Sequence, residues 1–265
     1  MGAGMTSKLP RLEPGSPAIV ITCEHGGNRI PMAYRALFET QRETLDSHRG
    51  FDAGALLMAQ TLAAALHAPL LAATTSRLLV DLNRSANHRA AHASVVRELP
   101  MAQRQRIVDR HHRPYRERAE RLMRKAIAES GRVIHVSCHS FTPQLHGRVR
   151  TADIGLLYDP ARISEKALCA DWKHALETAA PGLRVRRNYP YRGNNDGLTT
   201  WLRTRLLADV YVGIELEANQ QHLNGGVRAL HAALAESLRA SISGTVAATP
   251  CTTGSPDSAQ RGAFA

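Results

Sequence analysis

The chain alternates short apolar runs with longer segments of helical spacing, and this alternation constrains the fold more than any other feature. Strands separated by helices are typical of α/β domains, in which helices cover both faces of a sheet. We therefore predict an α/β fold with a mixed, largely parallel sheet that is covered by helices on both faces. The expected strands are 17–23, 68–74, 76–82, 132–140, 152–159, 183–188 and 209–219, and the expected helices are 52–68, 101–130, 164–180, 199–208 and 227–242.

One domain accounts for this pattern. No change of composition divides residues 17–246, and a chain of 265 residues is long enough to bury a sizeable core. Residues 1–16 and 247–265 are rich in Gly, Pro, Ser and Thr, so we expect two disordered ends.

The sequence indicates a cytoplasmic protein without a membrane partner. It has no run of the roughly 18 apolar residues that a transmembrane helix needs, and its first residues lack the hydrophobic segment of a secretory signal. The four cysteines form no CxxC pair, which favours a reducing compartment. They are Cys23, Cys138, Cys169 and Cys251.

The formal net charge of +11 suits anionic substrates or partners. Much of this charge lies in residues 104–132, within the longest expected helix, where acidic residues are interspersed as on a solvated face with (i, i+4) ion pairs. Only 5% of the chain is aromatic, which leaves few platforms for stacking nucleic-acid bases. We expect no nucleic-acid partner. A non-catalytic basic protein that binds anions or nucleic acid is the alternative from another functional class.

Polar and reactive residues end or follow several of the predicted strands. Sites in open α/β sheets form just outside the carboxyl ends of the strands, so we expect these residues to meet at one edge of the sheet. They are Glu24 and His25 after the first strand, Asp81, Asn83 and Arg84 at the end of 76–82, His139 in 132–140, and Glu215 and Glu217 in 209–219.

These residue types match a catalytic zinc site. Two imidazoles, His25 and His139, with a carboxylate from Asp52, Glu24 or another residue, would give three ligands and leave one position open. Water bound to zinc has a pKa of about 7 and becomes a nucleophile at neutral pH. A glutamate at a strand end would accept its proton, while arginine side chains would stabilise an oxyanion or clamp a substrate carboxylate.

Five strings, in this order, resemble the N-formylglutamate amidohydrolase family: CEHGGNRIP, HRGFDAGA, SRLLVDLNRS, HHRPYRER and SCHSFTP. The resemblance covers residues 17–240. Its most specific part is the string DLNR, which ends at Arg84, together with Arg77 seven residues earlier. Aspartoacylase and succinylglutamate desuccinylase are relatives of this family. The resemblance implies a zinc-carboxypeptidase-like fold and one zinc ion per chain.

The resemblance also implies that His25 and His139 bind the metal. The HxxE pairing of carboxypeptidases is absent, because Asn28 stands three residues after His25. The family pattern therefore leaves two candidates for the acidic ligand. Asp52, in GFDAGA, is the preferred candidate and Glu24 is the alternative.

Further residues that match the family would act on the substrate. Arg77 would polarise the scissile carbonyl, and Asn83 and Arg84 would bind a substrate carboxylate. The general base would be Glu217, in LEANQ, and Glu215, two residues earlier on the same face, is its competitor.

The segment 188–203 is dense in turn formers and then opens a helix. We expect Asp196 to cap that helix from Leu198. The segment is either a plain loop and cap or a substrate loop that brings Tyr191 and Arg192 over the site.

We therefore expect a zinc-dependent amidohydrolase that cleaves the amide of an N-acyl amino acid. The first choice of substrate is N-formyl-L-glutamate, which would give L-glutamate and formate. A deacylase of a different N-acyl amino acid is the alternative, because fold and metal do not fix the substrate. The expected partner is this small molecule, and the sequence predicts no oligomeric state.

Overall fold

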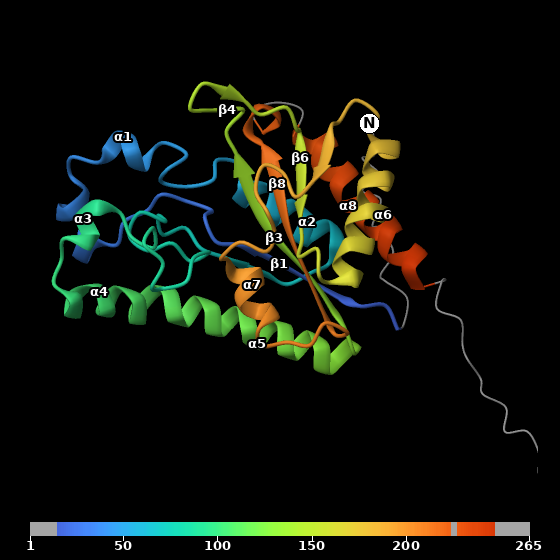
Figure 1. The fold of residues 1–265 in the computed structure, drawn as a ribbon, viewed down its shortest axis with the longest axis horizontal. Helices are drawn as coiled ribbons and strands as arrows, with labels where there is room; N and C mark the ends of the chain where they lie inside the picture. Colours follow the sequence, from blue (N-terminus) through green and yellow to red (C-terminus); the bar gives the residue numbers. More distant parts are fainter. Residues whose placement is uncertain (1–14, 224–226, 247–265) are drawn as a thin grey trace, which may run out of the picture.

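A six-stranded sheet lies at the centre of the computed structural model, which describes residues 15–223 and 227–246 (Figure 1). The strands are β1 (Ala18–Cys23), β2 (Leu70–Ala72), β3 (Val133–Phe141), β6 (Ile154–Leu157), β7 (Val185–Arg187) and β8 (Tyr211–Asn219). Their order is β2-β1-β3-β8-β6-β7, and neighbours are parallel except for β6 and β8. The prediction of a mixed, largely parallel sheet is confirmed.

The two central strands, β3 and β8, are buried along all 9 residues of each. Their parallel register pairs Ser137 with Glu215 and His139 with Glu217. Residues two apart on a strand share a face, and so do partners in a parallel ladder. All four polar side chains therefore lie on one face of the sheet, within buried strands that also carry His135, Ser140 and Asn219.

Helices cover both faces of the sheet, as predicted (Figure 1). One layer packs in an apolar core that contains the fully buried Trp172 and Leu156, and the other packs in a second core that contains Met123 and Tyr211. The first layer comprises α2 (Ala55–Leu66), α6 (Ile163–Ala179) and α8 (Val227–Val246), and the second comprises α5 (Arg113–Ser130) and α7 (Leu198–Arg203).

The basic helix predicted at 101–130 is continuous but contains one wide turn. A first part, α4 (Met101–Ile107), passes into α5 through a π-helical turn at Val108–His112. Pro114 accounts for the position of this turn, because it has no N–H to donate to the preceding turn and its ring crowds the carbonyl there. Gly131 ends the helix in a left-handed conformation with φ 72°.

The exposed side of this helix carries the expected (i, i+4) ion pairs. Asp109 lies 2.8 Å from Arg113, and Glu120 lies 2.7 Å from Arg124. Exposed helix pairs contribute only about 0.3–0.5 kcal/mol each, so packing of the opposite side fixes the helix on the sheet. That buried side presents Tyr115, Ala119, Met123 and Ala126.

The predicted strand at 76–82 is wrong. The segment forms turns, in which the Leu79 N–H donates to the Ser76 carbonyl at 3.0 Å, and it joins neither of the described sheets. Its apolar side chains are nevertheless buried in the same core as α5. A short apolar run fits a buried loop as well as a strand, so periodicity alone cannot separate the two.

The sequence patterns miss several short elements. One is the hairpin of β4 (Gln144–Leu145) and β5 (Arg148–Val149), which turns at His146 and Gly147 with φ of 49° and 75°. Two central residues with positive φ are typical of a type I′ hairpin turn. The others are η1 (Met32–Phe38), α1 (Arg42–Leu45), α3 (Ser94–Arg97) and η3 (Gln220–His222), and the helix predicted at 199–208 ends at Arg203.

The predicted disordered ends, apart from residues 15 and 16, lie outside the described residues. Among the helices that are described, none combines the length and the hydropathy needed to cross a lipid bilayer.

Candidate active site

A cavity of about 500 Å³ opens at the carboxyl ends of β1, β3 and β8. Every site residue predicted from the sequence except Glu24 lines it, as expected for the edge of a parallel sheet. The lining residues from that set are His25, Asp52, Arg77, Asn83, Arg84, His139, Tyr191, Arg192, Glu215 and Glu217.

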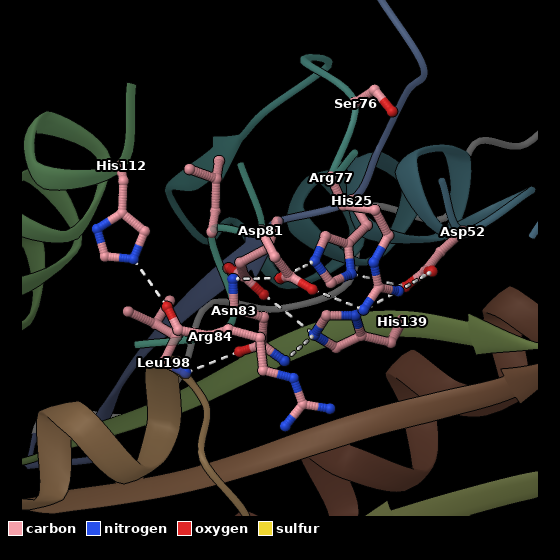
Figure 2. A network of polar contacts seen from close by, with 12 residues as sticks. His25, Asp52, Ser76, Arg77, Asp81, Asn83, Arg84, His112, His139 and Leu198 are labelled. Atoms are coloured by element: carbon pink, nitrogen blue, oxygen red, sulfur yellow. Dashed lines mark hydrogen bonds and ion pairs between the residues drawn. The ribbon is translucent and has the colours of Figure 1, made fainter. Parts of the chain in front are cut away.

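Three buried side chains at the bottom of this cavity converge on one another (Figure 2). Oδ2 of Asp52 lies 3.3 Å from Nδ1 of His25 and 2.8 Å from Nδ1 of His139. One donor atom from each residue lies within 4.8 Å of the other two. Two imidazoles and a carboxylate are a ligand set of catalytic zinc sites, so these residues could hold a metal ion and leave a position open toward the cavity.

Backbone contacts place two members of this triad. The N–H of Asp52 donates to the carbonyl of His25 at 2.9 Å, which ties the start of α2 to the loop after β1. That loop runs so close to residues 73–74 that a Cβ on Gly26 would lie 2.9 Å from a backbone oxygen, and one on Gly27 would do the same. The glycines are therefore needed for close approach of two chain segments.

In each histidine the inner nitrogen, Nδ1, faces Asp52, and the outer nitrogen, Nε2, contacts a second carboxylate. Nε2 of His25 lies 2.7 Å from Oδ1 of Asp81, and Nε2 of His139 lies 3.1 Å from Oε2 of Glu24. Burial opposes protonation of both rings, but these carboxylates and Asp52 outweigh it and raise the pKa of each histidine. A carboxylate behind a metal-binding histidine fixes the ring and leaves the inner nitrogen free for the metal.

Glu24 is fully buried behind His139 and faces away from the cavity. Its Oε1 accepts a hydrogen bond from the Tyr115 hydroxyl at 2.8 Å, and its Oε2 accepts one from Ser137 Oγ at 2.5 Å. Burial raises the pKa of Glu24, but bonds from His139 and Ser137 outweigh burial and lower it to about 2. The carboxylate that faces the inner nitrogens is that of Asp52, the preferred candidate from the sequence.

The two glutamates on β8 have different surroundings. Oε1 of Glu215 accepts a hydrogen bond from Thr199 Oγ1 at 2.8 Å. Oε2 of Glu217 is buried and has no hydrogen-bond partner among the described residues. Burial, reinforced by the nearby Asp52 and Glu215, raises the pKa of Glu217 to about 8, although His139 opposes the shift. A buried oxygen without a partner is rare in folded proteins and is typical of functional sites.

Arg77 bridges the two acids that flank His25. Its NH1 lies 3.3 Å from Asp52 Oδ1 and its NH2 lies 2.8 Å from Asp81 Oδ2, while 27% of its side chain remains exposed to the cavity side. Asp81 also accepts a bond from the Asn83 N–H at 2.9 Å. The chain from 77 to 83 thus holds both a cation and a carboxylate against the triad.

Asn83 and Arg84 anchor the loop before α7. Asn83 Oδ1 accepts a hydrogen bond from the Leu198 N–H at 2.7 Å, and Arg84 NH1 donates to the Asp196 carbonyl at 2.8 Å. The bond between Asn83 and Leu198 is drawn in Figure 2. The prediction that Asp196 caps α7 is wrong. Its carboxylate instead accepts hydrogen bonds from the N–H and the hydroxyl of Ser85. The Leu198 N–H at the start of α7 already donates to Asn83 Oδ1.

Several cavity residues have no role in the predictions from the sequence, among them Asp81, Arg49 and Arg150. Asp81 stands at the end of an expected strand, but no neighbouring residue in the sequence indicates that its carboxylate contacts Nε2 of His25. Arg49 and Arg150 also line the cavity. Arg150 follows the hairpin β4–β5, whose only sequence signal is the His-Gly pair between two strands of one polar and one apolar residue each.

A family model described as N-formylglutamate amidohydrolase matches residues 17–223, which is most of the chain. The chain belongs to the N-formylglutamate amidohydrolase family. The resemblance found in the sequence is confirmed, and the protein is an amidohydrolase.

Two solved structures of this amidohydrolase's fold are similar over nearly their whole length. Gene product Atu2144 from Agrobacterium tumefaciens is 28% identical, with a TM-score of 0.75, and the match covers 87% of this chain and 92% of that one. N-formylglutamate amidohydrolase from Ralstonia eutropha JMP134 is 19% identical, with a TM-score of 0.65, and the match covers 89% and 97% of the two chains. A comparison with curated proteins finds no match.

Proposed function

We propose that this amidohydrolase hydrolyses N-formyl-L-glutamate to L-glutamate and formate with one zinc ion held by His25, Asp52 and His139. The convergence of two inner imidazole nitrogens on Asp52 Oδ2 supports the metal. The family supports the substrate. A zinc ion at these three residues would supply a Lewis acid that makes water nucleophilic near neutral pH.

Glu217 is the proton carrier in this proposal. Glu217 lines the cavity and its buried Oε2 has no hydrogen-bond partner among the described residues, whereas Glu215 accepts a hydrogen bond from Thr199. Oε2 of Glu217 takes a proton from the attacking water as oxygen adds to the formyl carbon. It then gives that proton to the amide nitrogen as the C–N bond breaks, so that formate and the free amine result.

Arg77 stabilises the charge that develops on the formyl oxygen. Its guanidinium is already oriented by Asp52 and Asp81, so little reorganisation is needed when that charge appears. Asp81 and Glu24 act through the histidines, because each accepts a bond from the outer nitrogen of one ring.

The substrate's α-carboxylate binds at Arg84 in this scheme, assisted by Asn83. Arg84 is fixed by one nitrogen on the Asp196 carbonyl, and its other nitrogens remain for a carboxylate. Tyr191 and Arg192, from the loop before α7, line the same cavity and close over the bound amino acid.

The test is amine release by the purified, zinc-saturated protein. We expect glutamate to appear from N-formyl-L-glutamate, activity to vanish with a chelator, and activity to return with zinc. Release of amine from another N-acyl amino acid, but not from N-formyl-L-glutamate, would support the alternative, a deacylase of a different N-acyl amino acid. No release from any N-formyl or N-acyl amino acid would overturn the proposal.

A further inference from the structure

Arg150 enters the active-site cavity from a different part of the fold than Arg84. It directly follows the hairpin β4–β5, and its N–H donates to the Pro143 carbonyl at 2.8 Å. The Asn219 side chain donates to its carbonyl at 3.5 Å. These bonds close the base of the hairpin and fix the backbone from which the guanidinium projects into the cavity.

Two aromatic rings and a hydroxyl hold the Arg150 guanidinium. Its Cζ lies 5.6 Å from the centroid of Phe141 and 5.2 Å from that of Tyr191. Its NH2 donates to the Tyr191 hydroxyl at 3.0 Å. Contacts of this kind attract a cation to the ring face and orient the planar guanidinium without neutralising it.

Among the described residues no carboxylate pairs with Arg150, and this distinguishes it from Arg77 at the metal end of the cavity. Arg77 is paired with Asp52 and Asp81. None of the ion pairs among the described residues includes Arg150. Arg49 and Arg192 also line the cavity, but both are exposed at its rim. Arg150 is thus a fixed cation with free N–H groups and no counter-charge of its own.

We propose that Arg150 is a specificity-determining residue that binds the side-chain carboxylate of an acidic N-acyl amino acid. The inference rests on the proposed function, in which Arg84 takes the α-carboxylate and the triad faces the amide. A guanidinium fork pairs with a carboxylate through two parallel hydrogen bonds, which discriminates it from the neutral amide of the same shape. Arg150 therefore selects N-acyl glutamate over N-acyl glutamine.

The experiment compares N-formyl-L-glutamate with N-formyl-L-glutamine, which has nearly the same shape and no side-chain charge. We expect Arg150→Met to lower the ratio of kcat/KM values, glutamate over glutamine, by about 10- to 100-fold, mainly through KM. Arg150→Lys keeps the charge but loses the two parallel hydrogen bonds, so its kcat/KM ratio should lie between those of the unmodified protein and Arg150→Met. Arg148→Met, on the exposed part of the same hairpin, is the matched control and should leave the ratio unchanged.

An equal loss on both substrates in Arg150→Met would show that Arg150 binds the α-carboxylate or only supports the hairpin, and the inference would be overturned. If the unmodified protein hydrolyses neither substrate, the proposed function fails. Titration calorimetry with glutarate and butyrate then tests Arg150 alone. Tighter binding of glutarate that is lost in Arg150→Met would support the inference, and equal binding of both acids by the unmodified protein would overturn it.

Discussion

His139 and Glu217 lie directly opposite each other in the parallel ladder of β3 and β8. The ladder puts both side chains on the same face of the sheet. Nδ1 of His139 contacts the Asp52 carboxylate, and Oε2 of Glu217 has no hydrogen-bond partner within residues 15–223 and 227–246. Backbone hydrogen bonds between two fully buried strands therefore position the proposed metal ligand and the proposed proton acceptor. Loop movement is not needed to bring them together.

Glu217→Gln tests the proton carrier. We expect kcat to fall by about 10²- to 10⁴-fold, because an amide cannot accept the proton of the attacking water. Zinc content, measured by elemental analysis, should stay at one ion per chain in this proposal, since Glu217 is not a ligand. Glu215→Gln is the matched control on the same strand. A large loss in Glu215→Gln with little effect in Glu217→Gln would exchange the two roles.

Asp81→Asn tests the carboxylate behind His25. Removing the charge that holds Nε2 of His25 should weaken zinc binding by about 10- to 100-fold, measured by competition with a chromogenic chelator. Asp153→Asn is the control, because Asp153 is also buried but pairs with Arg184 and His222 outside the cavity. Equal zinc affinity in Asp81→Asn and the unmodified protein would contradict this role.

Gly26→Ala tests the close approach of the loop after β1 to residues 73–74. A Cβ at 2.9 Å from the Ala73 carbonyl oxygen forces the backbones apart, so we expect a loss of about 1–3 kcal/mol in the free energy of unfolding. Zinc occupancy should fall as well, because the same loop carries His25. Gly182→Ala meets no atom within 4 Å and should leave both quantities nearly unchanged. Denaturant unfolding of the metal-free chains gives the comparison.

His135 gives a pH-dependent contribution to stability that is independent of the metal. The ring is fully buried between Thr22 Oγ1 and the Tyr211 hydroxyl, each at 2.8 Å, and burial lowers its pKa to about 4. An unfolded histidine has a pKa of about 6.5, so the unfolded chain binds the proton more readily between these values. The free energy of unfolding should fall by up to about 3 kcal/mol from this group as the pH drops through that window.

The measurement is urea unfolding of metal-free protein at several pH values between 4 and 7. His135→Gln should show a shallower decline with falling pH than the unmodified chain, whatever its stability at pH 7. His174→Gln, on an exposed position of α6, serves as the control. Parallel curves for His135→Gln and the unmodified chain would refute the assignment.

The sequence predicts the meeting of His25 and His139 well, because β1 and β3 are parallel neighbours and their ends must reach one edge. It predicts Glu217 for the same reason. It does not decide between Glu24 and Asp52 as the acidic ligand. Glu24 and His25 are consecutive and point apart, and the direction that the Glu24 side chain takes depends on its hydrogen-bond partner. That partner is Tyr115, 91 residues away from Glu24, on a helix that the sequence describes only as a solvated basic face.

Other parts of the site depend on contacts that no local pattern encodes. Residues 76–82 look like a strand, yet they deliver Arg77 and Asp81 to the cavity as turns, with Arg77 N–H bonded to the Gly50 carbonyl at 3.3 Å. Arg150 reaches the cavity through a hairpin of two-residue strands, which is too short to leave a periodic signal.

The hydrogen bond from Tyr115 to Glu24 links the candidate metal centre to the basic helix that packs on the same face of the sheet. Tyr115 belongs to α5, in the helix layer opposite α2. It donates to Glu24, and the Glu24 carboxylate in turn contacts Nε2 of His139. In the proposed zinc site, substitutions beneath the basic helix can therefore change the metal affinity while every cavity wall stays intact, so that metal loading and substrate choice can change independently.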